Sequence, residues 1–125
     1  MLSQTCEAKM SDQKVELTTD GGFTGRGLGG VNVTGMNAEA TDGRRSCAGE
    51  LTEHESAELA KRIREASPES WKEFNEAHPD QIRYLLTIGK HTASWFGEDA
   101  PIPKDVQRLF DVLWPVRERL LRQCR

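Results

Sequence analysis

No stretch of the sequence approaches the ~18 apolar residues that a helix needs to cross a bilayer, and residues 1–13 lack the apolar segment of a secretory signal. An excess of basic residues is missing as well. The 17 lysines and arginines are outnumbered by 20 acidic residues, which gives a net charge of −3. Such a charge creates no basic field for a nucleic acid. We therefore expect a cytoplasmic protein with neither a membrane nor a nucleic acid as partner.

Cysteine is scarce. The chain has only Cys6, Cys47 and Cys124, which are odd in number, widely spaced and form no C-x-x-C pair. This spacing contains neither a complete disulfide framework nor a zinc pattern. Free thiols are therefore expected.

Motifs for metal and nucleotide binding are incomplete. The pair His54-Glu55 begins like a zincin helix, but Glu58 stands where the second histidine is required. Residues 25–30 match the G-x-G-x-x-G spacing of a dinucleotide site, yet the strand-like run 31–33 follows where that site needs the N-terminus of a helix. Neither motif predicts a site.

Other reactive side chains are scattered along the sequence. Cys47 has no base near it in sequence that would make it a nucleophile, and a metal site would need three distant histidines to meet. Four acidic residues are interpreted as solvated caps rather than as paired catalytic carboxylates. We predict no enzymatic activity, no cofactor and no metal; a small enzyme using Cys47 or gathered histidines is the alternative. The residues concerned are His54, His78, His91, Glu76, Asp80, Glu98 and Asp99.

The hydrophobic pattern predicts one domain of residues 14–125 behind a mobile leader of residues 1–13. Alternation predicts strands, and apolar residues at helical spacing predict helices. The order predicts an α+β fold: a four-stranded antiparallel sheet with helices packed on one face. The expected elements are strands at 14–19 and 31–33, a loop with at most a short edge strand at 35–50, helices at 52–66 and 67–78, strands at 80–89 and 91–96, and a helix from 102.

Three details of the expected helices can be tested. Thr52 and Glu55 form a capping box at the start of the first helix. Pro115 should kink or end the last helix, because a proline in mid-helix loses a hydrogen bond. The arginines beyond it are interpreted as a solvated helix face.

A glycine-rich segment, residues 20–30, separates the first two strands and contains a single large aromatic residue, Phe23. Surface loops carry recognition residues, and glycine lets a partner's backbone approach closely. Phe23 is therefore a candidate anchor for a partner. In the alternative interpretation the segment is an ordinary hairpin turn, and Phe23 folds back onto the sheet.

Three motifs in register resemble the emfourin family of protealysin inhibitors. Residues 15–25, Val-Glu-Leu-Thr-Thr-Asp-Gly-Gly-Phe-Thr-Gly, are similar to its opening strand and S/D-G-G-F-x-G signature. Residues 79–86 resemble its P-D-x-φ-x-Y strand, where φ is apolar. Ile102-Pro103, followed by Val106, Leu109 and Leu113, is similar to its closing helix.

The resemblance implies a small α+β protein from a bacterium that blocks thermolysin-like zinc metalloproteases. Three glycines of the loop, the segment 35–50 and the three tryptophans depart from the family's features. From the chemistry of the loop, the expected partner-binding residues are Asp20, Gly21, Gly22, Phe23, Thr24, Gly25 and Arg26. The alternative is a non-catalytic interaction module that binds a non-protease partner or a second copy through Trp71, Phe74 and the C-terminal arginines.

Overall fold

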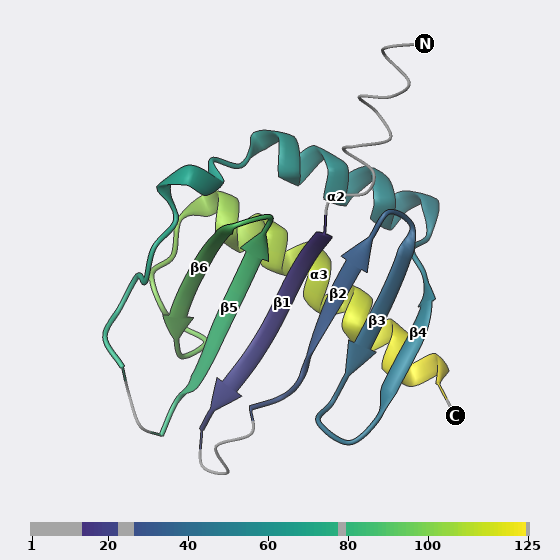
Figure 1. Ribbon diagram of the computed structural model, residues 1–125, viewed down its shortest axis with the longest axis horizontal. Coiled ribbons are helices and arrows are strands. Elements are labelled where there is room, and N and C mark those ends of the chain that lie inside the picture. The colour runs from purple at the N-terminus through teal and green to yellow at the C-terminus, as the bar shows by residue number, and fades with distance from the viewer. Residues whose placement is uncertain (1–13, 23–26, 78–79, 125) are drawn as a thin grey trace.

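The computed structural model describes residues 14–22, 27–77 and 80–124. The predicted leader, residues 1–13, lies outside the described residues. Within the described ranges, two helices, a 3₁₀ turn and six strands follow one another (Figure 1). They are β1 (Lys14–Gly21), β2 (Gly30–Thr34), β3 (Asn37–Thr41), β4 (Ser46–Glu50), α2 (Glu53–Glu65), η1 (Pro68–Ser70), β5 (Ile82–Ile88), β6 (His91–Phe96) and α3 (Lys104–Gln123).

The strands form one antiparallel sheet in the order β4-β3-β2-β1-β5-β6. The α+β class and the antiparallel sheet are confirmed, but the prediction of four strands is wrong. The segment 35–50 forms β3 and β4 instead of a loop with at most one strand. Its residues are small and polar and have low strand propensity. Ala38 and Ala40 are nevertheless buried, because their small side chains let α3 approach the sheet closely.

The two predicted hairpins, β1–β2 and β5–β6, are confirmed and lie side by side. They are joined by pairing between β1 and β5, in which Thr19 lies opposite Tyr84 and Asp20 opposite Arg83. The predicted central strand, β5, is an inner strand of the sheet. This pairing brings the glycine-rich loop next to the segment that precedes β5.

Helix α3 crosses one face of the sheet and contacts β1 to β4, and α2 packs against α3 (Figure 1). The capping box of Thr52 and Glu55 is present at the start of α2. Pro115 was predicted to kink or end the last helix; α3 continues across it, so the helix does not end there. Pro115 is exposed on the side of α3 away from the sheet. Among the described residues, no helix is both long and apolar enough to cross a membrane.

The predicted helix at 67–78 is wrong. Only Pro68–Ser70 forms a 3₁₀ turn, and the chain then runs extended along the outer edge of β6. The Phe74 N–H donates to the Ser94 carbonyl at 2.9 Å, and the Ser94 N–H donates to the Lys72 carbonyl at 3.1 Å. These hydrogen bonds satisfy edge groups of the sheet that would otherwise be unpaired, which outweighs the local helical pattern.

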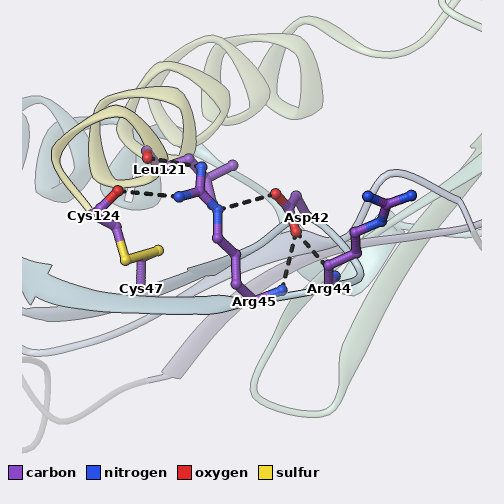
Figure 2. The surroundings of a disulfide bond; sticks show 6 residues. All are labelled: Asp42, Arg44, Arg45, Cys47, Leu121 and Cys124. Atoms are coloured by element: carbon purple, nitrogen blue, oxygen red, sulfur yellow. Dashed lines mark hydrogen bonds and ion pairs between the residues drawn. A yellow bond between two sulfur atoms is a disulfide. The ribbon is translucent and has the colours of Figure 1, made fainter.

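Cys47 of β4 and Cys124 at the end of α3 form a disulfide (Figure 2). Their Cα atoms are 5.7 Å apart, within the usual range for a disulfide. The prediction of free thiols is therefore wrong for this pair, because 77 positions of sequence separate residues that the fold brings together. Cys6 lies outside the described residues.

Candidate functional site

The candidate site is the base of the glycine-rich loop between β1 and β2. We call residues 20–22 and 27–30 the neck of this loop. Of the predicted partner-binding residues, Asp20, Gly21 and Gly22 belong to the neck. The others, Phe23, Thr24, Gly25 and Arg26, lie outside the described residues. The prediction that Phe23 points outward therefore stays a prediction.

Backbone hydrogen bonds close the neck. The Gly27 N–H donates to the Gly21 carbonyl at 3.0 Å, which joins the two sides of the loop. The Gly22 N–H donates to the Gln81 carbonyl at 3.1 Å, which ties the loop to the segment before β5. Gly27 has a φ of 71°, and a Cβ added there would lie 2.7 Å from the backbone of Asp20. Only glycine fits this closure.

A buried hydroxyl holds the far side of the neck. Thr19 of β1 is 9% exposed. Its Oγ1 accepts a hydrogen bond from the Leu28 N–H at 2.7 Å and donates one to the Gly29 carbonyl at 2.5 Å. One side chain thus fixes the backbone of two consecutive residues of the neck, Leu28 and Gly29.

Arg117 of α3 reaches the same place from the other layer. It is 6% exposed, so the interpretation of the C-terminal arginines as a solvated face is wrong for this residue. Its Nη2 donates to the Leu28 carbonyl, and its Nε donates to the Thr41 carbonyl at 3.2 Å. A buried guanidinium requires such partners, because an unpaired buried charge is costly. Arg117 is a site residue that sequence reasoning missed.

An ion pair borders the neck on the strand side. Arg83 donates through Nε to Asp20 Oδ1 at 3.0 Å and through Nη2 to Asp20 Oδ2 at 2.6 Å. The hydrogen bond from Arg83 to the Asp20 carboxylate raises the pKa of Arg83 and outweighs the opposing effect of burial. Asp20 is therefore occupied in holding β1 to β5.

Leu28 is the exposed apolar residue of the neck. The residue is 40% exposed, although its N–H and C=O groups are both bound by buried side chains. A leucine with a fixed backbone and a solvated side chain can enter an apolar pocket of a partner at little entropic cost. No sequence pattern pointed to Leu28 beyond its place between glycines.

The other sequence motifs either have structural roles or, among the described residues, do not come together as a site. Gly30 begins β2, so no helix follows the G-x-G-x-x-G match and the anion site of that fingerprint does not form. Burial raises the pKa of Glu55, but hydrogen bonds from Arg119 and the Thr52 N–H outweigh it and lower the pKa overall. Within the described ranges, no group of three metal-ligating side chains meets. Three of the four acidic residues, Glu76, Glu98 and Asp99, line one pocket, and Asp80 does not.

Comparisons of the chain with protein-family models, with curated proteins and with solved structures found no match. The resemblance to the emfourin family therefore stays a prediction. What the site offers chemically is a loop base fixed by hydrogen bonds from three elements, with an apolar side chain beside it.

Proposed function

We propose that this protein inhibits thermolysin-like zinc metalloproteases by inserting its glycine-rich loop into the active-site cleft. The observation that supports the proposal is the hydrogen-bonded neck. Ordering a free glycine-rich loop costs roughly 1–2 kcal/mol per residue, which opposes tight binding. In this fold Gly21, Gly22, Gly27 and Gly29 already have fixed positions, so the cost falls on fewer residues.

Two apolar side chains provide the proposed contacts. Phe23, at the tip of the loop in sequence, is the anchor for the pocket that accepts a bulky apolar residue just after the scissile bond. Leu28 extends the contact at the neck. A peptide tethered at both ends resists cleavage, because the cut ends stay together and religation competes with release.

The alternative function is an interaction module with a non-protease partner. Its proposed surface is largely occupied within the fold. Trp71 is buried, and its Nε1–H donates to Asp105 at 3.0 Å. Arg119 is paired with Glu55 at 2.6 Å. Whether a non-protease partner binds through the loop instead is tested by the same variants.

The experiment is an inhibition assay against several thermolysin-like proteases with a peptide substrate. We expect stoichiometric inhibition by the wild type and about a 30-fold loss for Phe23→Ala, which corresponds to ~2 kcal/mol at an interface anchor. Leu28→Ala should lose less, and Met36→Ala is the matched control because Met36 is 42% exposed in the β2–β3 turn. Full protease activity at a large excess of inhibitor, across all enzymes tried, would reject the proposal.

The disulfide bears on the compartment in which the protein acts. Disulfides persist in oxidising compartments and are rare in the cytosol. The Cys47–Cys124 bond weighs against the cytoplasmic location, which stays a prediction. Alkylation of free thiols in fresh cell extracts measures the redox state of this pair directly. If Cys47 and Cys124 are both alkylated, they were reduced in the cell, which would place the protein in a reducing compartment.

A further inference from the structure

A pocket of about 250 Å³ opens between β5, β6 and α3, and four aromatic residues line it. Tyr84 and Trp95 stack with ring centroids 5.5 Å apart, and Phe110 and Trp114 stack at 5.4 Å. The two stacked pairs meet at a steep angle, since Tyr84 and Phe110 are inclined by 82°. Phe110 and Trp114 are half-buried and form the accessible aromatic wall of the pocket, whereas Tyr84 and Trp95 are buried behind it.

The rim of this pocket is acidic. Besides the aromatic residues and Ile102, Glu98 and Gln107 line the pocket with acceptor oxygens, and no basic residue of the described chain lines it. Burial raises the pKa of Tyr84, and the negative charge of Glu98 raises it further while Arg117 opposes this. Glu98 also lines an adjoining pocket of about 450 Å³ together with Glu76 and Asp99. Aromatic faces and carboxylates both favour a cation.

The same aromatic cluster already holds one guanidinium. The Cζ atom of Arg117 lies 4.5 Å from the centroid of the Trp114 ring. That arginine is neutralised locally, because its Nη1 lies 3.3 Å from Glu118. Glu98 is exposed and has no such partner among the described residues. A cation bound in the pocket would provide Glu98 with an ion-pair partner.

We propose that this aromatic pocket binds an arginine side chain of a protein partner. The planar guanidinium stacks on an aromatic wall, and its N–H groups donate to Glu98 and Gln107. The pocket is smaller than the ~300–1,000 Å³ of typical small-molecule sites and suits one side chain. Arg117 contacts both Trp114 and the Leu28 carbonyl, so the pocket lies beside the neck and one partner can reach both. The inference does not require the partner to be a protease.

The test is an NMR titration of the intact protein with N-acetyl-arginine methylamide. Saturable shifts of the Trp95 and Trp114 indole N–H signals are expected, while Trp71, whose indole is bonded to Asp105, stays unchanged as an internal reference. The neutral isostere N-acetyl-citrulline methylamide should bind at least about five-fold more weakly. Glu98→Gln should weaken arginine binding by a similar factor, and Glu39→Gln, the same charge change on β3, should not.

Three outcomes would overturn the proposal. The first is equal binding of the arginine and citrulline probes, which would mean that charge plays no part. The second is the absence of saturable shifts at Trp95 and Trp114 in a protein whose Trp71 signal shows that it is folded. The third is tighter binding of N-acetyl-norleucine methylamide than of the arginine probe, which would make the pocket an apolar site.

Discussion

The β1–β2 loop and the β3–β4 turn lie at the same end of the sheet, but they are held in different ways. The β3–β4 turn is held by its own residues: Asp42 Oδ1 accepts the N–H groups of Arg44 and Arg45 at 2.9 and 3.1 Å. The neck of the β1–β2 loop has one backbone hydrogen bond of its own, from the Gly27 N–H to the Gly21 carbonyl, and is held in addition from outside, by side chains of β1 and α3. Because the β3–β4 turn is stabilised by its own residues, its other side chains can stabilise neighbouring parts of the fold. Because the base of the β1–β2 loop is stabilised by other elements, residues further along the loop remain available to contact a partner.

The β3–β4 turn indeed supports the end of α3. Arg45 donates through Nη1 to the Cys124 carbonyl at 3.0 Å and through Nη2 to the Leu121 carbonyl at 3.1 Å (Figure 2). These are carbonyls of the last helical turn, which have no partner within the helix. The disulfide fixes the same end of α3 to β4. Helix α3 in turn carries Arg117, so the locally held turn contributes indirectly to the externally held neck.

Breaking the disulfide is expected to have the largest effect on stability. Cys47→Ala, or reduction, opens a loop of 77 residues and should cost about 3–4 kcal/mol of unfolding free energy. Chemical denaturation with and without a reductant measures the change, and Cys6→Ser is the control. If the disulfide acts only on α3 and β4, inhibition at low temperature should survive. Loss of inhibition in a folded reduced protein would show that the end of α3 positions the neck.

Arg117→Met tests the external support of the neck directly. The Leu28 and Thr41 carbonyls lose a charged donor, and hydrogen bonds to charged groups contribute about 1.5–3 kcal/mol. We expect a loss of this size in denaturation and faster hydrogen exchange at the Leu28 amide. Arg108→Met, an exposed arginine on the same helix, is the control. Unchanged exchange at Leu28 would contradict the role given to Arg117.

Thr19→Val removes one hydroxyl from the neck and keeps the shape of the side chain. The Leu28 N–H and the Gly29 carbonyl lose their partner, which should cost about 1–2 kcal/mol. Thr18→Val, on the exposed face of the same strand, should have little effect. Protease inhibition should weaken in Thr19→Val beyond the loss of folded protein, because the loop is no longer held before binding. Equal inhibition by the two variants would argue against a preformed neck.

Acidification should loosen the β3–β4 turn, and this is the smallest of the expected effects. Hydrogen bonds from the Arg44 and Arg45 N–H groups lower the pKa of Asp42 below its ordinary value of 3.8. The turn is therefore fully held above about pH 4 and loses this support as the pH falls through the lowered pKa. Amide signals of Arg44 and Arg45 should shift in that range, and Asp42→Asn should abolish the titration. The Leu28 amide, bound by a hydroxyl, serves as the comparison.

Local patterns in the sequence predicted local features of the fold. The alternation of Val15 and Leu17 predicted β1, and Thr52 with Glu55 predicted the start of α2. The two hairpins and the α+β class followed from such patterns. Residues 35–50 and 67–78 were misassigned because their strands and edge contacts depend on neighbours rather than on their own propensities. The sequence predicted the glycine-rich loop as a candidate site, but it did not predict that Thr19 and Arg117 hold the base of this loop.

By itself, the sequence determined the β1–β2 and β5–β6 hairpins, the start of α2 and which strand faces are apolar, because glycine, capping residues and hydrophobic period act over a few positions. Only the tertiary structure decided that Cys47 meets Cys124, that β1 pairs with β5 and that Arg117 becomes a buried donor to the Leu28 carbonyl. Each of these contacts joins residues more than 60 positions apart. Such contacts form only when burial of the whole core brings the elements together, and no short stretch of sequence encodes that.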